Sequence, residues 1–162
     1  MSPEWIEQQN AETRLATSEA DARTRLAVDA AARAANQGPA VFHRFIKALT
    51  LNAEALPMLE GGELFGATAP VGREGFETSC QVNVEWRRVS IVGPRSEIVV
   101  FHYERGSTGI RVYQNSERKN PLPLQVSHDG EVGIFYNGAV RSPEQVAEFI
   151  IRRLVQIVKI ER

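Results

Sequence analysis

The first 37 residues constrain the fold most, because between Pro3 and Gly38 they contain neither glycine nor proline. This segment is rich in Ala, Glu, Arg and Gln, residues that favour the helical conformation. The composition therefore predicts one long helical arm over residues 1–37. The arm is expected to end where Pro39 follows Gly38, because proline interrupts the hydrogen bonding of a helix.

Such an arm is too long for the rest of the chain to cover. A helix over residues 3–36 measures about 50 Å at 1.5 Å per residue, whereas a compact chain of 162 residues has a diameter near 40 Å. We therefore expect an overhanging end with Trp5 and Ile6 near its tip. The alternative is a break at Asn10 or Thr17, both good cap residues, that folds the arm back onto its own core.

Two further helices are indicated by apolar periodicity. Residues 40–56 carry apolar side chains at steps of three and four. Residues 142–161 begin with Ser142 as N-cap and Gln145 completing a capping box. The apolar stripe of this C-terminal helix is wider than a single contact requires. Its additional apolar positions are Ile151, Val155 and Val158.

Residues 78–137 predict strands. Cys80, Val82, Val84 and Trp86 alternate with polar residues, which is the period of a half-buried strand. Turn signals such as Asp129-Gly130 separate later apolar runs. We expect five strands in a mostly antiparallel meander, with the C-terminal helix packed on one face, and therefore an α+β fold.

A glycine-rich segment separates the helices from these strands. Residues 57–77 hold five of the twelve glycines and two prolines, which predicts a loop of about twenty residues, an unusual length inside a compact domain. The expected organisation is a helical arm over 1–37 and an α+β domain over 38–162 that contains this loop.

Charge and cysteine content exclude several classes of protein. Twenty acids and nineteen bases give a net charge of −1, which disfavours nonspecific binding to nucleic acids or anionic membranes. The single cysteine, Cys80, excludes an intrachain disulfide and a cysteine-rich zinc cluster. No apolar run approaches the roughly 20 residues that span a bilayer, and no signal peptide is visible. We therefore expect a cytoplasmic protein without a membrane partner.

No pattern of catalytic or metal-ligating residues emerges. His43, His102, His128 and Cys80 show no metal-ligand spacing, and neither a phosphate-binding loop nor a G-x-S-x-G motif is present. Neither a metal nor a cofactor is predicted. Cys80 and His102 form a nucleophile–base pair only if the first two strands pair suitably, and a buried thiol is the ordinary outcome in phase with valines.

The leading hypothesis is a non-enzymatic module for protein–protein interaction, which assembles as a homodimer through the arm and the C-terminal helix. The residues expected at this contact are Trp5, Ile6, Leu15, Leu26, Ile151, Val155 and Val158.

Two alternatives stay open. The sheet face beneath the glycine-rich loop is a candidate for small-ligand binding or a modest enzymatic reaction, with Cys80, Trp86, His102 and Tyr113 as its residues. The outer sheet face is a candidate for single-stranded nucleic acid, because arginines alternate there with Trp86, Tyr103 and Tyr113.

Overall fold

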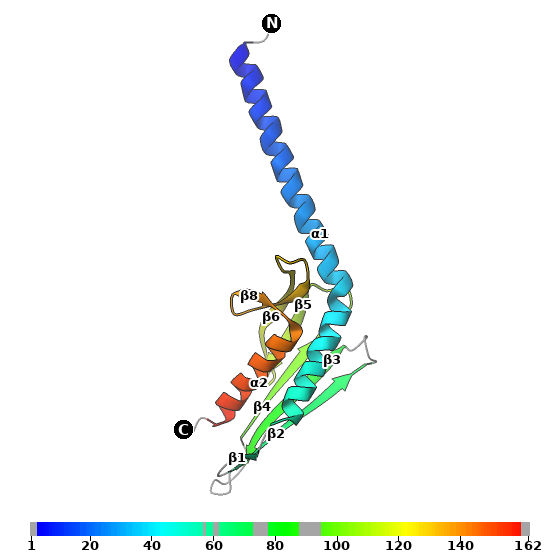
Figure 1. The fold of residues 1–162 in the computed structure, drawn as a ribbon, viewed down its shortest axis with the longest axis vertical. Coiled ribbons are helices and arrows are strands. Elements are labelled where there is room, and N and C mark those ends of the chain that lie inside the picture. The colour runs from blue at the N-terminus through cyan, green and yellow to red at the C-terminus, as the bar shows by residue number, and fades with distance from the viewer. Residues whose placement is uncertain (1–2, 57, 60–61, 73–77, 88–94, 160–162) are drawn as a thin grey trace.

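The computed structural model describes residues 3–56, 58–59, 62–72, 78–87 and 95–159, and its architecture is α+β (Figure 1). The elements in chain order are helix α1 (Glu4–Glu54), strands β1 (Met58–Leu59), β2 (Gly62–Val71), β3 (Ser79–Arg87), β4 (Arg95–His102), β5 (Gly109–Gln114), β6 (Glu117–Val126), β7 (Val132–Tyr136) and β8 (Ala139–Arg141), and helix α2 (Pro143–Lys159). Both helices lie on one face of the sheet and pack against each other.

Helix α1 is a single helix of 51 residues with Pro39 inside it. The predicted arm therefore continues into the predicted second helix, and the expectation of two helices is wrong. Pro39 has no N–H to donate to the preceding turn, but Phe42 and Phe45 follow it and are fully buried. This packing outweighs the lost hydrogen bond. The helix changes direction in its cyan part (Figure 1), as a helix with an internal proline does.

The N-terminal part of α1 projects from the rest of the chain (Figure 1). All residues from Pro3 to Asp29 are exposed except the half-buried Ile6. From Glu4 to Asp29 the helix measures about 40 Å at 1.5 Å per residue. Contact with the sheet side begins further along, where the Arg33 guanidinium donates a hydrogen bond to the Gly130 carbonyl. The helix is continuous and does not fold back.

The sheet is an antiparallel meander in which each strand pairs with its neighbours in the chain. The five predicted strands correspond to β3–β7. Among the described residues the sheet holds seven strands of three residues or more and the two-residue β1, so the count of five is wrong. Tight turns join several strands. Asn115 and Ser116 adopt positive φ between β5 and β6, as do Asn137 and Gly138 between β7 and β8.

Strand β2 replaces most of the predicted loop. It pairs with β3 along nine residues, from Glu63 opposite Arg87 to Val71 opposite Ser79. The loop prediction is wrong over Gly62–Val71, and its residues 57, 60–61 and 73–77 lie outside the described residues.

Helix α1 passes so close to β2 that Gly66 has no room for a side chain. A Cβ built on Gly66 would lie 2.4 Å from the Ala53 carbonyl oxygen. One helical turn earlier, the hydroxyls of Thr50 and Thr68 share a hydrogen bond of 2.9 Å. The glycine at this position therefore permits close packing between helix and strand.

The core lies between the two helices and the inner sheet face. Phe45 of α1 meets Phe101 edge to face at 5.0 Å between ring centroids, and Phe42 lies 5.3 Å from Tyr103. Helix α2 adds a buried row, which consists of Val146, Ala147, Ile150, Ile151, Leu154 and Val158. Each large aliphatic side chain buried in this way contributes about 1.5–3 kcal/mol.

The start of α2 forms as predicted. The amide of Gln145 donates to the Ser142 hydroxyl at 3.2 Å, and the Ser142 amide donates to the Gln145 side chain at 3.3 Å. This reciprocal pair is the expected capping box. Within the described part of the chain, neither α1 nor α2 has the length and apolar character that a membrane crossing requires.

Candidate functional site

The arm carries large apolar side chains into solvent. The exposed fractions are 67% for Trp5, 62% for Leu15 and 70% for Leu26, and Val28, which the sequence did not single out, is exposed to 61%. The hydroxyls of Thr13, Thr17 and Thr24 each donate to the carbonyl four residues earlier. These threonines therefore satisfy their own donors within the helix.

The C-terminal helix contributes less to a contact surface than expected. Ile151 and Val158 are only 3% and 2% exposed because they pack into the core of their own chain. Val155 is partly buried against the same core. The wide apolar stripe of α2 is explained by its position between α1 and the sheet, so Ile151 and Val158 are not available to a second molecule.

The four predicted ligand-binding residues do not come together. Cys80 and Trp86 belong to the alternation of β3 that faces the helices, where Cys80 is fully buried. His102 and Tyr113 belong to the opposite alternation, since His102 pairs with Ser79 and Tyr113 pairs with Val100. The sheet itself therefore separates the two pairs. In the segment expected to cover the site, Gly62–Val71 form strand β2, which extends the sheet sideways instead of lying over a face.

Cys80 also lacks the chemical character of a nucleophile. Burial raises the pKa of its thiol to about 11, so the reactive thiolate is scarce at neutral pH. No described group of three or more His, Cys, Asp and Glu side chains is arranged to hold a metal ion.

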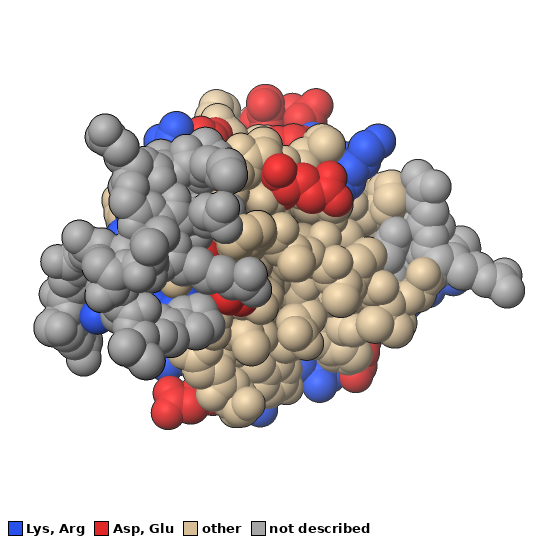
Figure 2. All heavy atoms as spheres, turned by 90° about the horizontal axis from the view of Figure 1, so that it is seen from below, with Lys and Arg blue, Asp and Glu red and all other residues tan. Residues whose placement is uncertain are grey.

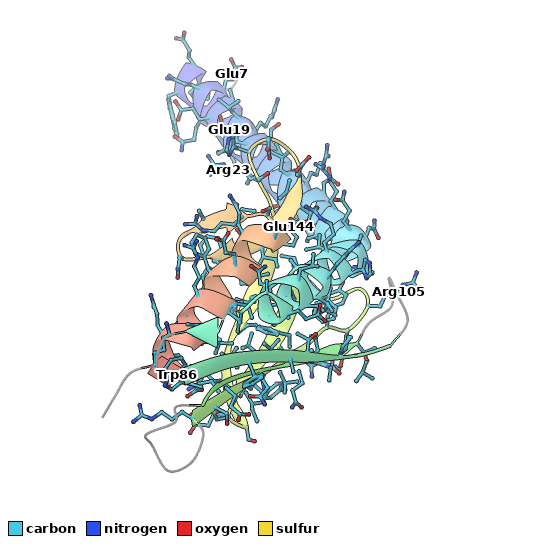
Figure 3. All side chains as sticks on the ribbon, turned by 60° about the horizontal axis from the view of Figure 1, so that its bottom comes forward. Glu7, Glu19, Arg23, Trp86, Arg105 and Glu144 are labelled. Carbon is cyan, nitrogen blue, oxygen red and sulfur yellow. The ribbon has the colours of Figure 1, made fainter. Side chains whose placement is uncertain are left out.

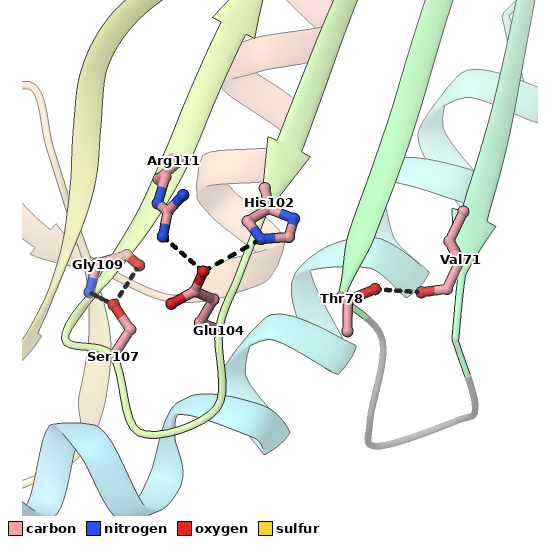
Figure 4. A network of polar contacts seen from close by, with 7 residues as sticks. All are labelled: Val71, Thr78, His102, Glu104, Ser107, Gly109 and Arg111. Carbon is pink, nitrogen blue, oxygen red and sulfur yellow. Dashed lines mark hydrogen bonds and ion pairs between the residues drawn. The ribbon is translucent and has the colours of Figure 1, made fainter.

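His102 takes part in a polar network on the outer face (Figure 4). The Arg111 guanidinium donates to the Glu104 carboxylate at 2.7 Å, and His102 Nε2 lies 3.8 Å from the same carboxylate oxygen. Hydrogen bonding to Tyr113, together with the charge of Glu104, raises the pKa of Arg111. The network joins the end of β4 to β5 at the surface.

The aromatic residues proposed for nucleic-acid binding do not share one exposed sheet face. Tyr103 is 2% exposed in the core, and Trp86 faces the helices beside Lys159, whose ammonium lies 5.6 Å from the ring centroid. Trp86 and Arg105 lie at opposite ends of the sheet (Figure 3). Seen from the end away from the arm, acidic and basic side chains border an area of other residues (Figure 2). This view shows no continuous basic surface of the kind that binds a polyanion.

A groove of about 650 Å³ lies where α2 leaves part of the inner sheet face uncovered. Its apolar lining comes from β4–β7 and from α2, and includes Val99, Val112, Leu122, Ile150, Leu154 and Ile157. Val112, Leu122 and Ile157 are only half-buried. The described lining also contains the cations Lys119 and Arg153, and none of it is Asp or Glu.

No sequence pattern predicts this groove. Its residues come from four strands and one helix, so no local spacing marks it. The available signal is weak: Arg153 lies between Ile150 and Ile157 on the side of α2 that faces the groove.

Comparison of the whole chain with protein family models, with curated proteins and with solved structures finds no match.

Proposed function

We propose that this protein is an assembly module that forms a two-fold homodimer through antiparallel contact of the arm, defined as residues Glu4–Asp29 of α1. The observation that carries the proposal is the combination of length and exposure: about 40 Å of helix holds Trp5, Leu15 and Leu26, each at least 62% exposed. Helices without tertiary contacts are only marginally stable in water, so a second molecule that covers the arm also stabilises it.

The charges of the helix favour an antiparallel arrangement. Within the arm, residues 4–21 contain five acids and one base, a net charge of −4, whereas residues 22–29 contain two bases and one acid, a net charge of +1. Parallel arms would place like charges side by side, and antiparallel arms place the acidic half of each opposite the basic half of the other. Closed two-fold dimers are also the commonest assembly.

One register fits both the apolar and the charged residues. Ala11, Leu15, Glu19, Ala22, Leu26 and Ala30 share one face, and their spacings of four, four, three, four and four read identically in either direction. A two-fold axis between Glu19 and Ala22 places Leu15 against Leu26 of the second copy. It also brings Glu19 beside Arg23 of that copy, twice per dimer. Figure 3 shows Glu19 and Arg23 on the arm, away from the sheet.

Sedimentation velocity across a range of protein concentrations tests the assembly. We expect a monomer–dimer equilibrium that Leu15→Gln weakens at least tenfold, because each dimer loses two buried leucine side chains worth more than 1.4 kcal/mol in total. Val28→Gln is the matched control, since Val28 is a similarly exposed apolar residue on the opposite side of the helix. A protein that stays monomeric at high micromolar concentration contradicts the proposal.

Cysteine cross-linking tests the orientation, because native Cys80 is buried. Molecules with Leu15→Cys should form few disulfides among themselves but should join efficiently to molecules with Leu26→Cys. Efficient cross-linking of Leu15→Cys alone identifies parallel arms and contradicts the antiparallel register.

A further inference from the structure

We propose that the groove between α2 and strands β4–β7 binds a small amphipathic anion, a carboxylate or similar acid with an aliphatic tail. The groove lies on the domain and not on the arm, so this binding site is independent of the proposed dimer. A volume of about 650 Å³ falls within the range of about 300–1,000 Å³ that is common for small-molecule sites.

The apolar lining accounts for the tail. Val112 from β5, Leu122 from β6 and Ile157 from α2 are half-buried in the free chain, and all three line the groove. An aliphatic chain would remove the rest of their surface from water, which is favourable in proportion to the area covered.

The cations account for the head group. Lys119 and Arg153 lie on different elements, β6 and α2, and both line the groove, whereas no described lining residue is acidic. The Lys119 ammonium contacts Glu117 at 3.2 Å, but this pair is solvent-exposed, with 47% and 76% of the two side chains accessible. An exposed ion pair of this kind is weak, so Lys119 can turn to an incoming anion at little cost. Gln114, Asn120 and Asn137 supply further polar groups along the groove.

The same charges argue against other occupants. A neutral apolar peptide would leave two cations beside an apolar contact, and burial of unpaired charge is unfavourable. A second copy of α2 would bring its own Arg153 toward that of its partner. An amphipathic anion fits both parts of the lining, because its head group pairs with the two cations and its tail covers the apolar side chains.

Calorimetric titration with octanoate, decanoate and dodecanoate below their micelle concentrations tests the proposal. We expect saturable 1:1 binding with about fourfold higher affinity for each added methylene, and weaker binding of 1-decanol than of decanoate. Arg153→Gln should weaken decanoate binding several-fold, whereas the neighbouring Arg152→Gln should leave it unchanged, because Arg152 pairs with Glu148 at 2.7 Å and does not line the groove.

A second pair of variants tests the location. Ile157→Trp should fill the groove and abolish binding, and Gln156→Trp, one residue away and outside the lining, should retain it. Circular dichroism of each variant checks that the fold is intact. Binding that is absent, independent of tail length, or equally sensitive to Arg152→Gln overturns the proposal.

Two further measurements distinguish a free acid from a membrane lipid, and a small ligand from a second copy of the chain. Sedimentation with vesicles of anionic phospholipid separates a membrane lipid from a free acid: retention on vesicles, lost in Ile157→Trp, identifies the lipid head group as the source of the anion. If Ile157→Trp changes the oligomeric state and no carboxylate binds, the groove is covered by a second copy and the proposal is wrong. Leu15→Gln, which acts only on the arm, should not affect decanoate binding.

Discussion

The hydroxyl of Tyr103 occupies the space that a side chain on Gly38 would need, since a Cβ at position 38 would lie 1.9 Å from the Tyr103 oxygen. The Tyr103 hydroxyl also donates to the Ser107 carbonyl at 3.1 Å. Helix α1 and the β4–β5 connection are thus in contact nine residues after the arm ends at Asp29.

We therefore expect Gly38→Ala to destabilise the protein. Overpacking costs about 1–3 kcal/mol, and it outweighs the gain of about 1 kcal/mol from replacing glycine by alanine in a helix. Urea unfolding should show a lower midpoint. Gly109→Ala is the control, because its nearest neighbour to an added Cβ is 3.7 Å away. An unchanged or raised midpoint for Gly38→Ala would show that Tyr103 moves aside freely.

Arg44 and Glu144 join the two helices through two hydrogen bonds of 2.9 and 2.8 Å. Burial acts to raise the pKa of Glu144, but the hydrogen bond and charge of Arg44 lower it below its ordinary value of 4.5. Since the folded-state pKa is depressed, this stabilisation is present above pH 4.5 and is lost as the pH falls through the folded-state pKa.

A double-mutant cycle of Arg44→Gln and Glu144→Gln should give a coupling energy of about 0.5–1 kcal/mol at pH 7, because both groups are about half exposed. The coupling should weaken as the pH falls below 4.5 and through the folded-state pKa of Glu144. The pair Arg152–Glu148, which lies within one helix, is the comparison and should couple by about 0.3–0.5 kcal/mol. A coupling that does not decrease with acid at any pH at which the protein stays folded contradicts the ionic interpretation.

The Cys80 thiol should not react with thiol reagents while the protein is folded. Burial raises its pKa from 9.0 to about 11, so the folded state retains the proton longer than the unfolded state. Stability should fall between about pH 9 and 11, by about 2–3 kcal/mol from this group. Cys80→Ala should show a shallower decline over the same range. Rapid modification of the native thiol by Ellman's reagent at pH 7 would show that the burial is transient.

Local sequence patterns predict an element correctly where its structure depends on one short segment. Ser142 and Gln145 identify the start of α2, and the alternation from Cys80 to Trp86 identifies β3 and its buried face. These features depend on residues only a few positions apart, so a sequence reveals them directly.

Long-range packing explains what local patterns missed. Pro39 favours a break, but Phe42 and Phe45 are held by Phe101 and Tyr103, about sixty residues away. Gly66 favours a loop, but the close approach of Ala53 and nine residue pairs with β3 make it part of a strand. The groove is missed for the same reason, because its lining residues from α2, β5 and β6 come together only after the chain folds.

The arm offers the most direct test of the proposed dimer in solution. In a monomer, the amides of Glu4–Asp29 are protected only by a helix without tertiary contacts, so they should exchange with deuterium rapidly. In a dimer, the amides near Leu15 and Leu26 should become protected.

Hydrogen exchange measured at 1 and at 100 μM protein should therefore show slower exchange in the arm at the higher concentration, with a change of at least tenfold. The amides of α2 provide the internal control, since their packing lies within one chain and should not depend on concentration. The Leu15→Gln variant should lose the concentration dependence while Val28→Gln retains it. Arm amides that exchange at the same fast rate at both concentrations would mean that the arm remains solvent-exposed, and the assembly proposal would then fail.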